Sequence, residues 1–597
     1  MKKIIILALA AFSAFSCKGF LNKQNPYKIE SEYYFVDESS LEIYSNAFIR
    51  SFDINLDDFL AADRYADAYA WSGLYGYYTD NYTAYDASNW TTSNWSQLRS
   101  INYYLDNMRK ASASGEILNH YEGVGRFFRA LFYYLKVQTF GAVPIYKSMI
   151  SSTDTEALTK DRDNREDVFR FILEDINYAC ENCLTSDKYR NRASYIHKYV
   201  ALAYKARFCL YEGTYRKYHS VDPSTGQPWK SDESEMYLKE CIDACEKLME
   251  SGIYSLADNP NARKTQYRAM FTDPDGCKTY TTNEWIWAKD NDETLNVKDI
   301  SYSINDYFVN AQHAQYSFNR DFINTYLKLD GTPFEDFEGC SFVDECKDRD
   351  YRLAQTIRTP GFTRDGGSKK AAPDVTYSQT GYHPIKYLLD DTAHDPQGMT
   401  TYTDVPMMRY AEVLLSYAEA KAELGQMTEA VWNKTVKPIR ERAGVKNIYP
   451  KEADPYMVAY FQNKVTDPYI LEIRRERGIE YAMEYLRYHD IMRWHQGELL
   501  ARPWRGLWIT EVDKELDLDN DGNTDTIVTA NSSLKSNCKI LYIDGASTTG
   551  NKLSKGTSGY IQTSTALTRK WADYKYVKPI PATAITENPN LTQNPGW

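Results

Sequence analysis

Acidic and amide side chains near residue 520 have the spacing of a calcium-binding loop. The stretch reads DLDNDGNTD and supplies Asp517, Asp519, Asp521, Asn523 and Asp525. Oxygen ligands at loop positions 1, 3, 5 and 9 around a glycine, with a backbone carbonyl from Asn523, fit this kind of site. Position 12 is Val528, so another acid or water must replace the usual bidentate Glu. The pattern predicts a structural Ca²⁺ site, and a solvated turn between two strands is the alternative.

Signals for other chemistry are weak in this sequence. It contains no Gly-x-Ser-x-Gly, His-Glu-x-x-His or phosphate-binding loop. A glycoside hydrolase needs two carboxylates across a cleft, and 82 acidic residues offer too many spacings to identify a pair. The eight His are scattered, which gives zinc no convergent ligand set. Cys340 and Cys346 are close enough in a polar loop to pair, but spacing alone does not decide it. We therefore expect no catalytic residue and no organic cofactor.

The element most strongly organised by its sequence runs from Asp467 to Trp494. Apolar residues recur there at helical spacing, Asp467 suits a helix cap, and Pro468 suits the first helical position. We therefore predict one helix over Ile470–Trp494. Four carboxylates repeat every fourth residue along it: Glu472, Glu476, Glu480 and Glu484. Like charges at this spacing repel, so we predict that a basic element carrying Arg440 and Arg442 packs against them.

The rest of the chain predicts a mainly α fold. Helical patterns fill about 31–250 and 406–495 of the 597 residues, and pairs of this length suggest a tetratricopeptide-like scaffold. The stretches at about 254–405 and 500–597 are irregular with few short strands, and we expect them to form a packed ligand-binding layer. A net charge of −12 argues against a nucleic-acid partner. The 51 Tyr suit either polar-ligand surfaces or wet helix seams.

The N-terminus carries a targeting signal. Lys2 and Lys3 precede an apolar run over 4–12 that is too short to span a bilayer, and small residues precede Cys17. This arrangement resembles a bacterial lipoprotein signal. We expect residues 1–16 to be a signal peptide and Cys17 to be the lipid-bearing first residue of a mature chain over 17–597. Plain secretion with cleavage nearby is the alternative.

Several segments together resemble the SusD/RagB family of outer-membrane nutrient-binding lipoproteins. The similar segments are Cys17–Leu21 with Pro26, Phe128–Pro144, Met408–Ala420, Ile439–Gly444, Glu476–Trp494, Pro579–Pro581 and Asn588–Trp597. One departure lies near the start, where Gly19 and Asn22 stand in place of the family's usual acidic residues. The resemblance extends over almost the whole chain and is specific for the family, not for the ligand.

This resemblance implies a function that composition and periodicity do not reveal. It implies a binding protein, not an enzyme, lipid-anchored in the outer membrane and facing the cell exterior. It implies capture of an oligosaccharide or polysaccharide and delivery to a SusC-like TonB-dependent transporter. A peptide- or protein-binding member of the same family and a surface glycoside hydrolase are the alternatives.

Two stretches have the residue types that would bind a sugar, which needs aromatic platforms for its C–H face and polar groups for its hydroxyls. The first contributes Asp63, Arg64, Trp71, Tyr75, Trp90 and Asn94. The second contributes Trp285, Trp287, Tyr316 and Arg320. The resemblance implies ligand contacts from broadly these regions. Trp95, Trp285 and Trp287 could instead be core anchors, whereas Gly73 and Gly76 favour exposure of Trp71 and Tyr75.

Overall fold

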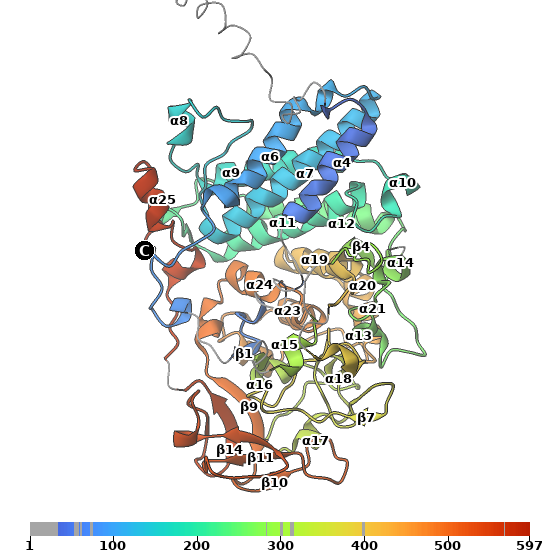
Figure 1. Ribbon diagram of the computed structural model, residues 1–597, viewed down its shortest axis with the longest axis vertical. Coiled ribbons are helices and arrows are strands. Elements are labelled where there is room, and N and C mark those ends of the chain that lie inside the picture. The colour runs from blue at the N-terminus through green and yellow to red at the C-terminus, as the bar shows by residue number, and fades with distance from the viewer. Residues whose placement is uncertain are drawn as a thin grey trace, which may run out of the picture.

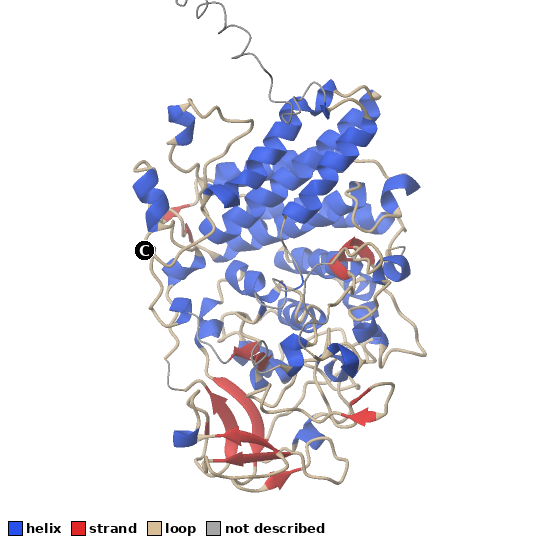
Figure 2. Ribbon diagram, in the orientation of Figure 1, coloured by secondary structure: helices blue, strands red, loops and turns tan. Residues whose placement is uncertain are grey.

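The fold is known from a computed structural model. It describes residues 34–597 except 53–55, 57–58, 60–62, 72–75, 282, 299–302, 311–315, 397–399 and 566–567. Cys17 and Tyr75 lie outside the described residues, as does the side chain of Tyr316. The mainly α fold with few short strands is confirmed (Figure 2).

Long helices form the upper layer of the molecule (Figure 1). They are α4 (Glu38–Ser51), α6 (Thr92–Asn107), α7 (Gly115–Phe140), α9 (Arg165–Asn182), α11 (Lys198–Tyr218) and α12 (Ser234–Glu250). Consecutive long helices pack on each other as pairs, α6 with α7 and α11 with α12, and α9 bridges α7 and α11. Side chains cap three of their N-termini, from Asp37, Ser114 and Asn164. This pairing is the predicted tetratricopeptide-like arrangement.

A second helical group lies directly beneath this layer (Figure 1). It contains α19 (Tyr410–Glu423), α20 (Glu429–Lys434), α21 (Val436–Arg442), α22 (Pro455–Tyr460), α23 (Pro468–Glu480) and α24 (Arg487–Arg493). Helix α19 packs on α11 and α12 above and on α23 below. It therefore joins two helical groups that are far apart in sequence into one scaffold.

The prediction of one helix over Ile470–Trp494 is wrong, because a turn separates α23 from α24. Met483 and Tyr485 in this turn have φ of +66° and +65°, which L-residues rarely adopt. Tertiary hydrogen bonds take backbone groups that a continuous helix would use. The Met483 N–H donates to the Tyr69 hydroxyl at 2.7 Å, and the Lys386 ammonium donates to the Ala482 carbonyl at 2.7 Å. Local periodicity could not reveal these distant partners.

Shorter elements fill the lower half and the edges of the molecule. The remaining α-helices are α8 (Thr155–Leu158), α10 (Asp187–Arg190), α13 (Gln266–Ala269), α14 (Gly276–Tyr280), α15 (Asp306–Val309), α16 (Arg320–Ile323), α17 (Phe342–Glu345), α18 (Leu353–Thr356) and α25 (Ala582–Glu587). Six 3₁₀ turns are described: η1 (Gly76–Tyr78), η2 (Met108–Lys110), η3 (Thr392–His394), η4 (Gly497–Ala501), η5 (Asp544–Ala546) and η6 (Asp573–Tyr576). Connections between these elements keep the irregular stretches packed on the scaffold.

The described strands form small separate sheets. The two-stranded pairs are β1 (Tyr69–Trp71) with β5 (Tyr316–Phe318), β2 (Val221–Asp222) with β3 (Gln227–Pro228), β4 (Trp285–Lys289) with β8 (Val405–Arg409), and β6 (Thr363–Arg364) with β7 (Lys369–Lys370). The three-stranded sheets are β13–β14–β9 and β10–β11–β12, from β9 (Trp504–Ile509), β10 (Glu515–Leu516), β11 (Thr526–Thr529), β12 (Lys539–Tyr542), β13 (Lys552–Leu553) and β14 (Gly559–Thr563). Figure 2 shows the three-stranded sheets at the lower end of the molecule.

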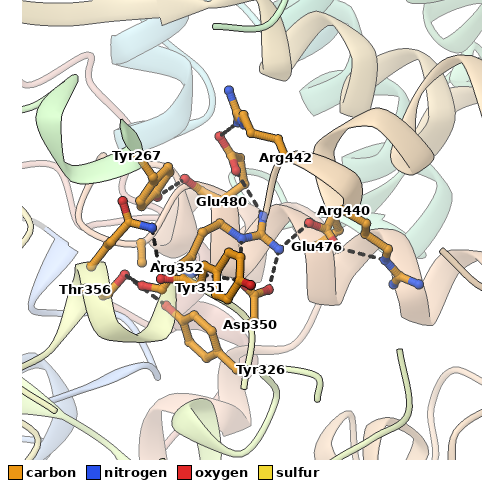
Figure 3. Close-up of polar contacts among 12 residues, drawn as sticks. Tyr267, Tyr326, Asp350, Tyr351, Arg352, Thr356, Arg440, Arg442, Glu476 and Glu480 are labelled. Carbon is orange, nitrogen blue, oxygen red and sulfur yellow. Dashed lines mark hydrogen bonds and ion pairs between the residues drawn. The ribbon is translucent and has the colours of Figure 1, made fainter. Parts of the chain in front are cut away.

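The predicted basic partner of the α23 carboxylates is confirmed (Figure 3). Arg440 of α21 bonds Glu472 at 2.5 Å and Glu476 at 3.0 Å. Arg442 bonds Glu480 at 2.5 Å. All five side chains are buried, and Arg forms such buried pairs well because its fork donates to two oxygens at once.

Two further arginines that sequence reasoning did not name complete this buried ion network. Arg352, in the irregular region, bonds Glu476 at 2.6 Å and Glu480 at 3.0 Å. Arg409 of β8 bonds Glu480 at 2.8 Å and Glu484 at 2.7 Å. Burial alone would raise the pKa of Glu480, but Arg442, Arg409 and Arg352 hold that pKa below its usual value. The network ties the irregular layer to the helical scaffold.

Candidate functional site

The two stretches predicted to contact a ligand meet at one antiparallel ladder. In this β1–β5 pair, Trp71 lies opposite Tyr316 and Tyr69 lies opposite Phe318. Nearly 250 residues of sequence separate these partners, as their numbers show. The ladder therefore places the end of β1, with Trp71, beside the start of β5.

A stacked group of three side chains lies beside this ladder. The Arg64 guanidinium is 4.1 Å from the centre of the Trp71 ring and 5.2 Å from that of Tyr65. Arg64 also donates to the Tyr65 hydroxyl at 3.2 Å, and the Tyr65 and Trp71 rings meet edge to face at 5.7 Å. All three are partly exposed. We call Arg64, Tyr65 and Trp71 the aromatic stack; its fixed ring and guanidinium faces suit an apolar surface edged with hydroxyls.

A cavity of about 220 Å³ adjoins the aromatic stack through Tyr65. Six tyrosines line it: Tyr65, Tyr77, Tyr78, Tyr485, Tyr488 and Tyr576. They come from the loop before β1, from η1, from the α23–α24 turn, from α24 and from η6. We call this space the tyrosine cavity. Its rings offer flat apolar faces with hydroxyl tips, which is the chemistry that a carbohydrate ligand requires.

The polar groups of the tyrosine cavity include one with unused hydrogen-bonding capacity. His489 lies 5.0 Å from the Tyr485 ring, and its Nε2 is buried without a hydrogen-bond partner among the described residues. Burial lowers the pKa of His489 to about 4, so the ring is neutral at physiological pH. Lys575 also lines the cavity, but its ammonium is already bonded to Asp80 at 2.8 Å.

Asp63 lies in the interior rather than at the ligand surface. It is 1% exposed and accepts a hydrogen bond from the Tyr69 hydroxyl at 3.1 Å. Burial raises the pKa of Asp63 to about 7. The expectation that Asp63 contacts a ligand is corrected, because its carboxyl supports Tyr69, which in turn holds the α23–α24 turn.

Trp285 and Trp287 are also core residues, which corrects their interpretation as a sugar platform. Their exposed fractions are 0% and 2%. The Trp287 indole N–H donates to the Ser194 carbonyl at 3.0 Å. A Cβ at Gly276 would lie 2.2 Å from the Trp285 ring, so that ring is enclosed on this side. Strand β4 packs against β8 and α11 and leaves both rings inside.

Arg320 is fully buried in α16 and belongs to a second ion cluster. It bonds Asp336 at 2.6 Å, Glu345 at 3.1 Å and the Tyr382 hydroxyl at 2.6 Å. A ligand could reach this guanidinium only by displacing these partners. The prediction of a ligand contact at Arg320 is therefore corrected.

Trp90 and Asn94 lie at the start of α6. The Trp90 ring is partly exposed and packs on Trp95 at 5.3 Å and Phe140 at 4.9 Å. The Asn94 side-chain oxygen accepts the Thr91 N–H at 3.0 Å, which caps the helix. Asn94 also borders a separate recess of about 590 Å³ against α7. Neither residue has a described contact with the aromatic stack.

Sequence reasoning missed the residues that the C-terminal half contributes to the cavity. Tyr485 and Tyr488 sit in a segment interpreted as scaffold, and Tyr576 lies in the irregular tail. The abundance of Tyr was the one available signal, and it does not say which tyrosines converge. The left-handed conformation of Tyr485, which places it on the cavity wall, has no sequence signature.

The structure brings together part of the predicted calcium loop. Carboxylate oxygens of Asp517, Asp519 and Asp525 all lie within 4.8 Å of one another. Asp521 instead pairs with Lys370 at 3.0 Å, and the Asn523 amide donates to Asp521 at 3.2 Å.

The nine cysteines from Cys180 to Cys538, including Cys340 and Cys346, are free thiols.

The structure thus shows a paired-helix scaffold with an aromatic recess where distant segments meet. Comparison of the sequence with known families then identifies the family: residues 283–597 match the SusD family, and residues 38–195 match a family described as starch-binding and associating with the outer membrane. The chain belongs to the SusD family.

Individual relatives agree with this assignment. SusD-like protein P38 of Formosa agariphila is 23% identical over 65% of this chain and 69% of its own length. A SusD-like protein from Bacteroides fragilis superposes with a TM-score of 0.67 at 19% identity, covering 94% of this chain and 98% of that one. A SusD-like carbohydrate-binding protein from the same species gives 0.67 at 21% identity over 94% and 100%. These structural similarities establish the fold.

Proposed function

We propose that this chain is a cell-surface glycan-binding lipoprotein that captures an oligosaccharide or polysaccharide and passes it to a SusC-like TonB-dependent transporter. Membership of the SusD family supports binding as the activity. The description of the second matching family as starch-binding and outer-membrane-associated, and the carbohydrate-binding title of a structural neighbour, support the ligand class and the location.

The observation that carries the proposal is the aromatic stack next to the tyrosine cavity. Arg64 is fixed by stacking on the Trp71 ring and by its hydrogen bond to the Tyr65 hydroxyl, so binding a ligand there costs little side-chain entropy. The cavity beside it adds tyrosine rings and the unpartnered His489 Nε2. Together they combine ring faces for C–H groups with donors and acceptors for hydroxyls.

Calorimetric titration of the purified mature chain with a glycan panel that includes starch oligosaccharides tests this proposal. We expect one panel member to bind and Trp71→Ala and Tyr488→Ala to weaken that binding. Tyr85→Ala is the control, because the Tyr85 side chain is 88% exposed and outside the cavity lining. Binding that is unchanged in both site variants would place the ligand elsewhere.

The same measurement separates the alternative functions. A peptide-binding member of the family would give heat with oligopeptides and none with glycans. A surface hydrolase would release sugar from the bound glycan. A hydrolase needs a carboxylate pair, and the described residues that line the tyrosine cavity include neither Asp nor Glu. This lining supports a binding role.

Anchoring at Cys17 is the second part of the proposal. Among the described residues, no helix combines the length and apolar character needed to cross a membrane, and Cys17 itself lies outside them. We expect Cys17→Ser to stop incorporation of labelled palmitate and to move the protein out of the outer-membrane fraction. Co-purification of a TonB-dependent transporter from solubilised membranes tests the delivery step. Wild-type protein that incorporates no labelled palmitate would contradict the lipid anchor. Wild-type protein that co-purifies with no transporter would contradict the delivery step.

A further inference from the structure

The loop between β10 and β11 folds around its own carboxylates. Asp517 accepts the N–H groups of Asp521 at 3.1 Å and Gly522 at 2.8 Å. Asn520 and Gly522 have φ of +59° and +89°, which turns the backbone sharply around the acidic side chains. The loop therefore holds a fixed conformation in which side chains two to eight positions apart converge.

Three carboxylates of this loop converge. Oxygens of Asp517, Asp519 and Asp525 lie within 4.8 Å of one another. Lys370 forms its direct ion pair with Asp521, which is not one of these three carboxylates. A cation bound among these oxygens would neutralise the group.

A separate observation points to what the loop binds. Asp519 is 8% exposed, and its Oδ1 is buried with no hydrogen-bond partner among the described residues. Asp525 Oδ1 is buried and unpartnered in the same way. Desolvated carboxylate oxygens without donors are costly unless a cation coordinates them. Two such oxygens in one group indicate a metal site and not a solvated turn.

We propose that Asp517, Asp519 and Asp525 bind one Ca²⁺, with the Asn523 carbonyl and water completing its shell. The donor set is oxygen only, without His or Cys, which suits a hard cation such as Ca²⁺ and not zinc. Val528 is buried in β11 and offers no ligand, so the site keeps water. This site lies outside the tyrosine cavity and does not depend on the proposed function.

The ion would fasten two parts of the lower end together. The Asp519 carbonyl accepts the Gly361 N–H at 3.2 Å, and Asp521 pairs with Lys370 of β7. A cation that fixes Asp519 therefore also fixes the loop against the β6–β7 hairpin. Removal of the ion should loosen both segments.

Metal analysis and calorimetry of the full mature chain test this site. We expect protein purified without chelator to carry one equivalent of calcium, and chelator-treated protein to rebind CaCl₂ with release or uptake of heat. Hydrogen exchange over 517–525 and 361–370 should speed up at least about fivefold after chelation. Asp519→Asn should abolish calcium binding, whereas Glu235→Gln, which removes an exposed carboxylate on α12, should leave it intact.

Two results would overturn the proposal. One is the absence of stoichiometric calcium together with no calorimetric response of chelated protein to CaCl₂. The other is undiminished calcium binding in both Asp519→Asn and Asp525→Asn. Circular dichroism of each variant verifies folding, and Asp517→Asn gives a third reading if one of them fails to fold. Preference for MgCl₂ over CaCl₂ at equal concentration would overturn the identity of the ion.

Discussion

The buried ion network along α23 and the tyrosine cavity beside it differ in how fully their polar groups are paired. In the network, Glu480 bonds three arginines and is 0% exposed. In the cavity, His489 Nε2 has no partner among the described residues, and the aromatic stack is partly exposed. The bonds of Glu480 are completed within the chain and serve the fold, whereas the partly exposed aromatic stack leaves ring faces open to solvent.

The α23–α24 turn belongs to both regions and explains how they coexist. Glu484 in the turn bonds Arg409 of the network at 2.7 Å. The next residue, Tyr485, lines the cavity. The turn changes the backbone direction between Glu484 and Tyr485, so that one side chain reaches the network and the other reaches the cavity. The sequence predicts a continuous helix here and does not reveal this connection between scaffold and site.

The largest effect is expected from breaking the network at its centre. Glu480→Gln leaves Arg352, Arg409 and Arg442 short of a buried counter-charge, which costs about 3–5 kcal/mol of unfolding free energy. Urea denaturation measures this. Glu235→Gln, at an exposed i,i+4 pair, is the matched control and should leave the urea midpoint nearly unchanged. Similar urea midpoints for Glu480→Gln and Glu235→Gln would contradict a structural role for the network.

Trp287→Ala should lower stability, as Glu480→Gln does, and should not weaken glycan binding as the cavity and aromatic-stack variants do. Truncating a buried Trp removes packing worth about 3–5 kcal/mol, and the Trp287 ring is 2% exposed. We expect a large drop in thermal stability with unchanged glycan affinity of the folded fraction. Weakened affinity at unchanged melting temperature would return Trp287 to the ligand surface.

Stability should fall on acidification in two steps. Burial lowers the pKa of His120 and His489 to about 4 and that of His197 to about 3. The unfolded chain, with His pKa near 6.5, binds more protons in this window, so stability drops as pH falls from about 6.5 toward 4. Glu480, whose pKa is lowered when folded, adds a loss that begins near its unfolded pKa of about 4.3 and continues as pH falls.

Denaturant unfolding at a series of pH values follows these steps. Glycan affinity should stay level between pH 5.5 and 8, because His489 of the cavity remains neutral throughout. Asp63 and Asp404, whose pKa values burial raises to about 7 and about 6, gain stability in the same window, so the histidine contribution is measured in an Asp63→Asn, Asp404→Asn background. Stability of that variant that rises as pH falls from 6.5 to 4 would contradict the burial of these histidines in neutral form.

The smallest effect on stability, with the clearest effect on binding, is expected for Trp71→Ala. The ring is partly exposed, so thermal stability should change little. Loss of one stacked platform should weaken glycan binding about tenfold, which corresponds to about 1.4 kcal/mol. Calorimetric glycan titration of Trp71→Ala and of the control Tyr85→Ala measures this loss of affinity. A fall in stability as large as that of Trp287→Ala would assign Trp71 to the core.

Some site residues could be recognised before folding and others could not. The prediction that Trp71 is exposed rests on the glycines that follow it, and its ring is partly exposed in the fold. Trp285, Trp287 and Arg320 were misassigned for a common reason: an aromatic or cationic residue in an irregular stretch looks the same whether it faces solvent or a buried partner. Asp336 and Glu345, which neutralise Arg320, are close in the fold and have no signal in the sequence.

Sequence by itself determined the mainly α class, the family resemblance, the acidic loop and the demand of the α23 carboxylates for arginines. These follow from periodicity, short-range spacing and charge balance, which act over a few residues. Tertiary structure alone decided that α23 ends at Glu480, that β1 meets β5, and that tyrosines from both ends of the chain line one cavity. These features depend on contacts between residues hundreds of positions apart, where the free energy of packing outweighs local preference.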